Sequence, residues 1–352
     1  MKIQNEADFQ TVRARWGKRL LILGHYYVPD ETIRLTDRQG DSLALSQIAA
    51  AEEECEAIIF CGVHFMAETA DILANSPEKI ARRGGVRIPV LLAAQGAGCP
   101  MADMAELEEV EKFWQRLESI MEADALVVPV TYVNSSAAIK AFCGRHDGFV
   151  CTSSNAREIL RRAFSQREKV LFLPDQYLGR NTALQLGVPE GQLVSRSASD
   201  EEFQNARVIL WDGYCPVHEK MLPNVVCEVQ KEHPRAKLIV HPECRSEVVA
   251  MSAAAGSTTF LIQEIERALP GEAFLMGTEA RLVERLRNER TDLNIYHLGE
   301  PHFCDDMGKN TRDSLFSTLE QLDSGDLRRR VCVSDEICAP ATIALRNMLD
   351  AT

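Results

Sequence analysis

Short apolar and β-branched runs recur along the chain, and each ends in a cluster of polar residues. Leu20–Leu23, Ala125–Val130 and Lys237–Val240 are runs of this kind. A stretch with the apolar spacing of a helix follows each run, so the pattern predicts strands and helices in alternation. This alternation is typical of α/β proteins with a largely parallel sheet.

Three sets of such segments follow one another in the same order, which predicts an internal threefold repeat. The first set closes its strands with His25, Asn134 and Glu243, which are each 109 residues apart. The second set comprises Ile58–Cys61, Phe149–Asn155 and Gly256–Thr259, each ahead of a helical run. The strands of the third set lead to Cys99, Cys215 and Cys304.

We therefore expect an α/β fold of three similar three-layer α/β/α units with parallel sheets around a pseudo-threefold axis. Each unit would have three strand–helix elements. The predicted parts are an N-terminal helix packing on the body (1–19), three α/β units (20–110, 111–225 and 226–310) and C-terminal helices completing the body (311–352). Because ligands bind at the loops beyond the carboxyl ends of parallel strands, the chemistry should lie where these loops meet.

Cysteine is the first candidate for that chemistry. The chain has 11 cysteines, and no pair has Cys-x-x-Cys spacing. An odd count in a large chain does not suggest a disulfide framework. Cys99, Cys215 and Cys304 occupy equivalent places in the repeat, so three thiolates could hold one metal centre with an open coordination position. From the residues alone, zinc and a [4Fe–4S] cluster both fit this arrangement.

Three other cysteines, Cys61, Cys151 and Cys244, also lie near strand ends. None of them has a cysteine counterpart in all three units, and we interpret them as packing residues or neighbours of the site.

Acid–base groups also gather at the predicted strand ends. His25, Tyr27, His241 and Glu243 would suit proton removal from carbon and dehydration, because imidazole titrates near neutral pH and burial can tune a carboxyl group. Hydroxyl-rich segments open three predicted helices: Gly40-Asp41-Ser42, Thr152-Ser153-Ser154-Asn155 and Gly256-Ser257-Thr258-Thr259. Each alone is an ordinary helix cap, but three around one centre would form a pocket for an anionic substrate.

Charge and composition exclude some functions. The formal net charge of −13 argues against nucleic acid as the main partner. No apolar stretch approaches the ~20 residues of a membrane span, and Met1–Lys18 has no apolar signal core. We expect no membrane association and a cytoplasmic location.

These motifs together resemble those of the quinolinate synthase family of iron–sulfur type. The segments that carry the resemblance are Gly24–Tyr27, Gly40–Leu43, Phe60–Ala70, Gly98–Met104, Thr131–Ala137, Cys151–Ala156, Phe172–Asp175, His241–Cys244 and Gly256–Thr258. Gly24 and Val28 depart from residues common in the family. The Cys-x-x-Cys-x-x-Cys variant that some members carry near the third ligand is absent at Cys304.

The resemblance implies a transferase that condenses iminoaspartate (iminosuccinate) with dihydroxyacetone phosphate to give quinolinate, phosphate and water in de novo NAD biosynthesis. It implies one [4Fe–4S] cluster per chain, held by Cys99, Cys215 and Cys304, with one open iron as a Lewis acid. The implied catalytic residues are Tyr27, Glu243, His25 and His241. The implied substrate-binding residues are His25, Ser42, Tyr132, Asn134, Ser153, His241, Glu243 and Thr258. Functional coupling to L-aspartate oxidase would supply the iminoaspartate.

Other functions remain alternatives on the sequence alone. They are an aconitase-like iron–sulfur dehydratase with another substrate, a zinc protein with three cysteine ligands, and a non-catalytic iron–sulfur sensor. A sensor would not need acid–base residues beside its cysteines.

Overall fold

The computed structural model describes residues 2–351, and the chain packs as two compact units. Unit 1 comprises Met1–Cys99 and Cys304–Cys338, and unit 2 comprises Pro100–Phe303 and Ala339–Thr352. The division into five parts stays a prediction. The α/β fold with parallel sheets between helices is confirmed, with sheets of five, five and four strands.

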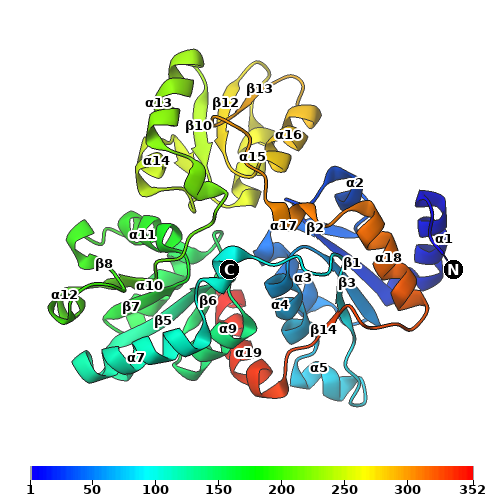
Figure 1. Cartoon of the computed structure of the whole chain (residues 1–352), viewed down its shortest axis with the longest axis horizontal. Coiled ribbons are helices and arrows are strands. Elements are labelled where there is room, and N and C mark those ends of the chain that lie inside the picture. The colour runs from blue at the N-terminus through cyan, green and yellow to red at the C-terminus, as the bar shows by residue number, and fades with distance from the viewer. Residues whose placement is uncertain (1, 352) are drawn as a thin grey trace. The chain divides into compact units, whose positions relative to one another are not determined.

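Unit 1 contains one five-stranded sheet in the order β14-β4-β3-β1-β2. Its strands are β1 (Leu20–His25), β2 (Arg38–Gly40), β3 (Ala57–Cys61), β4 (Val90–Leu92) and β14 (Arg330–Val331). Its helices are α1 (Glu6–Trp16), α2 (Asp30–Ile33), α3 (Ser42–Ala51), α4 (His64–Ala74), α5 (Pro77–Arg82), α17 (Asp305–Gly308) and α18 (Arg312–Asp323). Strand β14 pairs antiparallel with β4, which departs from the expected all-parallel sheet. Helix α18, orange in Figure 1, packs beside α1.

Unit 2 contains the other two sheets. The larger has the order β6-β5-β7-β9-β8 and the smaller β11-β10-β12-β13. Their strands are β5 (Val127–Tyr132), β6 (Phe149–Cys151), β7 (Lys169–Leu173), β8 (Leu193–Ser195), β9 (Val208–Leu210), β10 (Lys237–Val240), β11 (Ala254–Ala255), β12 (Ala273–Gly277) and β13 (Asn294–His297). All the strand pairs of these two sheets are parallel.

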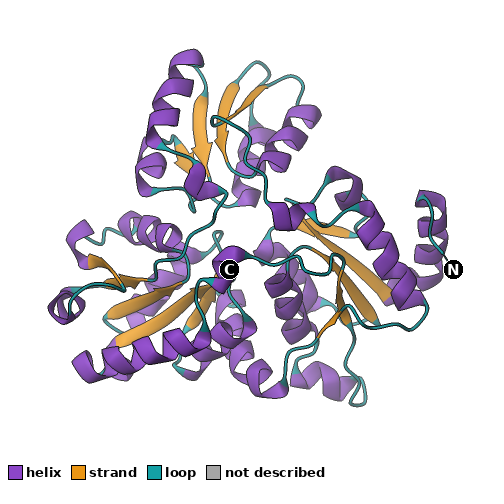
Figure 2. Ribbon diagram, in the orientation of Figure 1, coloured by secondary structure: helices purple, strands orange, loops and turns teal. Residues whose placement is uncertain are grey.

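The helices of unit 2 begin with α6 (Pro100–Asp103), α7 (Leu107–Met121), α8 (Ala123–Leu126), α9 (Ala137–Arg145), α10 (Ala156–Gln166), α11 (Gln176–Gln185) and α12 (Asp200–Asn205). Then come α13 (Pro223–Glu232), α14 (Ser246–Met251), α15 (Thr258–Arg267) and α16 (Ala280–Glu289). Helix α19 (Asp335–Leu349) begins in unit 1 and ends in unit 2. Helices flank the strands of each sheet (Figure 2).

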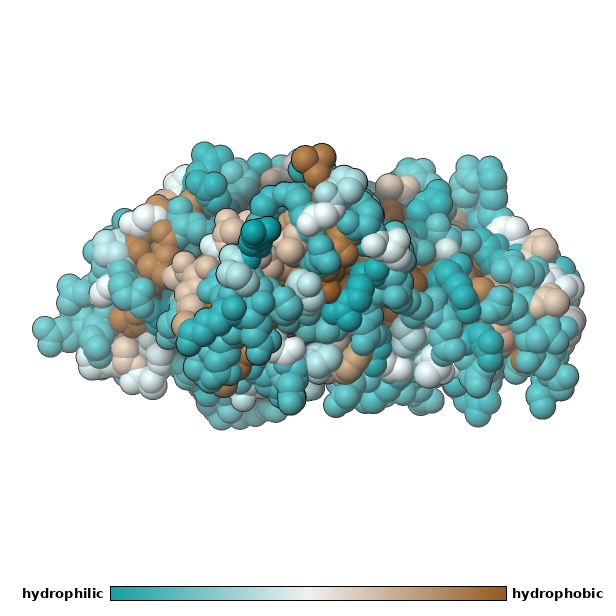
Figure 3. All heavy atoms as spheres, turned by 90° about the horizontal axis from the view of Figure 1, so that it is seen from above, coloured by the Kyte–Doolittle hydropathy of each residue, from teal (hydrophilic) through white to brown (hydrophobic). Residues whose placement is uncertain are grey.

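Burial follows from this layering. Every residue of β3, β5 and β7 is buried, because helices cover both faces of a parallel sheet. The smaller sheet of unit 2 has its own core of apolar residues, including Val226, Val240, Val248 and Leu275. The outer face in Figure 3 is mostly hydrophilic, with scattered apolar residues. Within residues 2–351, no helix combines the length and the apolar character needed to cross a lipid bilayer.

The three sheets share one topology. If β8 and β14 are left out, each sheet has four strands, which we number in chain order. In each sheet the second strand lies on one side of the first, and the third and fourth strands lie on its other side. The three orders are β2-β1-β3-β4, β6-β5-β7-β9 and β11-β10-β12-β13. The internal repeat is therefore real at the level of strand order. Each repeat has four strands rather than the three expected.

Candidate functional site

The strand ladders identify which strand-end residues are equivalent between sheets. The ladder between the first and third strands ends at the pairs Gly24–Cys61, Thr131–Leu173 and Val240–Gly277. Counted from the first-strand member of each pair, the next residues are His25, Tyr132 and His241. The residues three positions after the same members are Tyr27, Asn134 and Glu243. The expected match of His25 with Asn134 and Glu243 is therefore wrong by two residues, and the equal spacing of 109 was a coincidence.

The second set of expected equivalences also needs correction. Ile58–Cys61 lies in β3, a third strand, whereas Phe149–Asn155 and Gly256–Thr259 follow or contain second strands. The true counterpart in unit 1 is β2, which leads into Ser42 at the start of α3. Ser42, Ser153 and Thr258 thus occupy the same place after the second strand of each sheet.

A buried acid–imidazole pair forms the centre of the candidate site in unit 2. Glu243 and His218 are 3% and 1% exposed. His218 Nδ1 lies 2.7 Å from Oε2 of Glu243 and 3.2 Å from Sγ of Cys215. Since a carboxylate can only accept, His218 carries a proton on Nδ1. Its Nε2 lies 3.4 Å from the Thr278 hydroxyl.

His241 lies against the same pair. Its ring stacks on His218 with centroids 4.6 Å apart. The Glu243 backbone N–H donates to Nδ1 of His241 at 3.3 Å. Because Nδ1 accepts this bond, the proton of the neutral His241 ring resides on Nε2.

Tyr132 completes the network around Glu243. Its buried hydroxyl is hydrogen-bonded to Glu243 and to Ser153. Burial and the Glu243 charge raise the pKa of Tyr132 well above its usual value, so the phenol stays protonated. Burial alone would raise the pKa of Glu243, but the His241 and His218 imidazoles and the hydrogen bonds from His218 and Tyr132 lower it to about 2. Glu243 is therefore a carboxylate at neutral pH.

Two further oxygens in this region have no hydrogen-bond partner among the described residues. They are Oδ1 of Asn134 and Oδ2 of Asp175. The other carboxyl oxygen of Asp175 accepts the backbone N–H groups of Tyr177 and Leu178, both at 2.8 Å. Burial and the Glu243 charge raise the pKa of Asp175 well above its usual value, which favours the protonated form of this carboxyl group.

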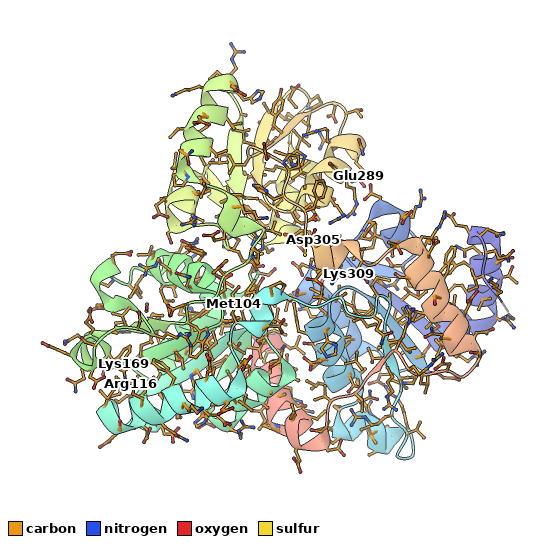
Figure 4. The ribbon with its side chains drawn as sticks, viewed as in Figure 1. Met104, Arg116, Lys169, Glu289, Asp305 and Lys309 are labelled. Carbon is orange, nitrogen blue, oxygen red and sulfur yellow. The ribbon has the colours of Figure 1, made fainter. Side chains whose placement is uncertain are left out.

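The loop that carries Cys215 is held by backbone contacts. The Gln176 N–H donates to the Gly213 carbonyl at 2.9 Å, next to a parallel bridge between Asp175 and Gly213. A Cβ at Gly213 would lie 2.5 Å from the Pro174 carbonyl oxygen, so only glycine fits there. Met104, labelled in Figure 4, accepts the Trp211 indole N–H at its carbonyl oxygen at 2.6 Å.

In unit 1, His25 and Tyr27 repeat the geometry of His241 and Glu243. The Tyr27 N–H donates to Nδ1 of the buried His25 at 3.2 Å. The two rings meet edge to face with centroids 4.9 Å apart. His25 therefore also carries its neutral-state proton on Nε2.

The segments of Cys99 and Cys304 are tied together within unit 1. The Gly98 N–H donates to Oδ1 of Asp306 at 3.0 Å. Lys309 Nζ lies 2.6 Å from the same carboxylate and 2.9 Å from the Gly96 carbonyl. Figure 4 labels Asp305 and Lys309, which begin and follow α17. Cys304 is the N-cap residue of this short helix.

Burial separates the cysteines into three classes. Cys99, Cys215 and Cys304 are partly exposed, and none of the cysteines is in a disulfide. Cys55, Cys61, Cys143, Cys151, Cys244 and Cys338 are buried, whereas Cys227 and Cys332 are exposed. Burial raises the pKa of Cys55 to about 12 and raises the pKa values of the other five buried thiols. Cys61, Cys151 and Cys244 are all buried, which fits their interpretation as packing residues or neighbours of the site.

Thr258 is 3% exposed at the first position of α15, and Ser42 is half-buried at the first position of α3. The structure thus brings Tyr132, Ser153, His241 and Glu243 together in unit 2, close to Cys215. Sequence reasoning singled out neither His218 as a central residue nor Asp175 and Thr278. The Cys-x-x-His spacing from Cys215 to His218 was the available signal for the first.

Cys215, His218 and Glu243 offer ligand atoms that all lie within 4.8 Å of one another. A thiolate, an imidazole and a carboxylate are ligands that zinc accepts. His218 and Glu243 already satisfy each other at 2.7 Å, so their proximity does not require a metal ion.

The fold and site define an α/β protein with polar groups gathered at the carboxyl ends of like-ordered parallel strands. Residues 9–350 match the quinolinate synthetase A protein family. The chain is 46% identical to a quinolinate synthase of Rhodopirellula baltica, covering 97% of this chain and 89% of that protein. It is 45% identical to a quinolinate synthase of Halalkalibacterium halodurans, covering 99% and 94%. The chain belongs to the quinolinate synthase family.

Proposed function

We propose that this chain condenses iminoaspartate with dihydroxyacetone phosphate to give quinolinate, phosphate and water, a step of de novo NAD biosynthesis. The observation that carries the proposal is the buried Glu243 carboxylate, held by His218 and Tyr132 beside Cys215. Such a group suits proton transfers on a small substrate. The match of residues 9–350 to the family supports the same reaction.

We further propose that Cys99, Cys215 and Cys304 hold one [4Fe–4S] cluster. The donor set fits, because these three are the partly exposed thiols, whereas six others are buried thiols of raised pKa. When bound, the cluster would supply an open iron as a Lewis acid for a substrate oxygen.

The chain's own residues would bind the anionic substrates with neutral donors. Tyr132, Ser153, Ser42 and Thr258 offer hydroxyl groups, and Asn134 offers an amide. His25 and His241 present Nε2 protons, because their Nδ1 atoms accept backbone N–H groups. This arrangement lets a protein of net charge −13 bind carboxylate and phosphate groups locally.

Proton transfer would centre on Glu243, with Tyr27, His25 and His241 as further acid–base groups. In the substrate-free state Glu243 is a weak base, because two side chains donate to it. A substrate that displaces the Tyr132 hydroxyl removes one of these bonds and raises the basicity of Glu243.

Iminoaspartate would come from a functionally coupled L-aspartate oxidase. A cytoplasmic location stays part of the same proposal.

The experiment is anaerobic purification, iron and sulfide counting, and an assay of quinolinate from the two substrates. We expect about four irons per chain and quinolinate formation, with both lost in Cys99→Ser, Cys215→Ser and Cys304→Ser. Cys227→Ser is the matched control, because Cys227 is exposed on α13. Zinc in place of iron, or a full cluster without quinolinate, would overturn the proposal.

A further inference from the structure

One buried side chain holds the backbone on both sides of Glu243. Asn181, on α11, is 3% exposed. Its Nδ2 donates to the Pro242 carbonyl at 2.8 Å and to the Cys244 carbonyl at 2.9 Å. A primary amide nitrogen has two N–H groups, so a single side chain satisfies two acceptors that flank one residue.

The segment around Glu243 depends on such outside contacts. Pro242 has no N–H to donate. His241 N–H donates to the Gly277 carbonyl at 2.9 Å, and Cys244 N–H donates to the His241 carbonyl at 3.0 Å. Pro242 and Cys244 are buried, so carbonyls left without donors there would be costly. Asn181 supplies the donors for both.

Helix α11 packs against β7 and β9 of the larger sheet of unit 2. Asp175 caps its first turn through two backbone N–H groups. A Cβ at Gly179 would lie 2.6 Å from the Phe172 ring and 2.7 Å from Leu210, so the helix approaches the sheet as closely as glycine allows. Figure 1 places α11 beside α14, the helix that follows the Glu243 segment.

We propose that Asn181 is a positioning residue that fixes the Glu243 carboxylate by holding the two carbonyls that flank it. The contact links the larger sheet of unit 2, through α11, to the strand end of the smaller sheet. Within residues 2–351, the Asn181 side chain hydrogen-bonds to the Pro242 and Cys244 carbonyls and not to His218 or Tyr132, so it acts through the backbone. The inference rests on the proposed function in taking Glu243 as the group that handles the proton.

Three variants test the role. Asn181→Ala removes both donors, Asn181→Ser keeps one, and Asn181→Asp keeps the size but turns an oxygen toward two carbonyls. Asn205→Ala is the matched control, because Asn205 is exposed and, among residues 2–351, its amide donates only to the Glu201 carbonyl of its own helix. We expect kcat to fall about 10- to 100-fold in Asn181→Ala, with KM within about threefold.

A double-mutant cycle separates positioning from general damage. If Asn181 acts through Glu243, adding Asn181→Ala to Glu243→Gln lowers kcat no further. An equal loss in both backgrounds would overturn the proposal, as would an unchanged kcat in the single variant. If Asn181→Ala does not fold, Asn181→Ser takes its place in the cycle.

A second readout does not depend on activity. Hydrogen–deuterium exchange of residues 241–245 in the cluster-loaded protein should be faster in Asn181→Ala than in wild type and unchanged in Asn205→Ala. Equal exchange in Asn181→Ala and wild type would overturn the proposal. If wild type with a full cluster makes no quinolinate, the proposed function fails, whereas the exchange comparison still decides whether Asn181 holds the Glu243 segment.

Discussion

His218 Nδ1 donates to Oε2 of Glu243 across 2.7 Å, and the same nitrogen lies 3.2 Å from Sγ of Cys215. A single imidazole therefore connects the proposed proton-handling carboxylate to a proposed cluster ligand. Glu243 keeps the proton of His218 on Nδ1, since a carboxylate accepts and does not donate. The pair is buried, so water competes little for these bonds.

Replacing Glu243 tests the centre of this network. Glu243→Gln keeps the shape but removes the charge, so we expect kcat to fall by about 100-fold or more while iron and sulfide content stays at the wild-type level. Steady-state assays of quinolinate formation, with iron counts on the same samples, measure both. Glu247→Gln, an exposed change on α14, is the control. Wild-type turnover in Glu243→Gln would contradict the role.

Asp175 should make stability depend on pH in the opposite sense from an ordinary carboxylate. Burial and the Glu243 charge raise the pKa of Asp175 in the folded protein, whereas the unfolded chain titrates near the usual 3.8. Below that value both states are protonated. As the pH rises above 3.8, the unfolded chain ionises first, which lowers its free energy, so the free energy of unfolding decreases.

Asp175→Asn removes this titration and can still accept the two N–H groups that cap α11. We expect similar urea midpoints for variant and wild type near pH 4, and a higher midpoint for the variant at pH 8. Asp313→Asn is the control, because the side chain of Asp313 is 86% exposed. A variant-to-wild-type difference that does not change with pH would show that the pKa of Asp175 is not raised in the folded protein.

Thiol reactivity should follow the burial classes of the cysteines. In cluster-free protein we expect iodoacetamide to label Cys99, Cys215, Cys304, Cys227 and Cys332, because thiolates at accessible positions react. The six buried thiols should remain unlabelled in the folded state. After cluster reconstitution, the first three should become protected while Cys227 and Cys332 still react. Mass spectrometry of peptides measures each site, and labelling of Cys99, Cys215 and Cys304 in the loaded protein would contradict the ligand assignment.

The loop of Cys215 should be sensitive to one added methyl group. In Gly213→Ala the new Cβ would lie 2.5 Å from the Pro174 carbonyl oxygen, so the loop must shift. We expect a loss of stability of about 1–3 kcal/mol and lower iron content, measured by urea unfolding and iron counting. Gly191→Ala is the matched control, because nothing lies within 4 Å of its added Cβ. Equal iron content in both variants would contradict a role for this loop geometry in holding the ligand.

The sequence by itself determined the alternation of strands and helices, because β-branched runs and helical spacing are local signals. It also determined the equivalence of Cys99, Cys215 and Cys304, which follow β4, β9 and β13. These are the fourth strands of the three repeats when β8 is left out. It placed His25, His241 and Glu243 near strand ends, whereas Tyr132 came only from the family resemblance. The second equivalence was wrong because β2 and β11, which are three and two residues long, carry almost no pattern. The first was wrong because an apolar run does not fix the last residue of a strand.

Only the tertiary structure decided which polar groups share a site and in what state. His218 is 25 positions from Glu243, and Asn181 is 61 positions from Pro242, so no local pattern joins them. The register in which the strands pair, rather than the spacing of residues along the chain, decided that Tyr27, Asn134 and Glu243 occupy equivalent positions in the three repeats. Burial decided which thiols have raised pKa values, because desolvation depends on every neighbour that excludes water. Composition and motif therefore indicate the chemistry, whereas packing sets the charges and distances at which it can operate.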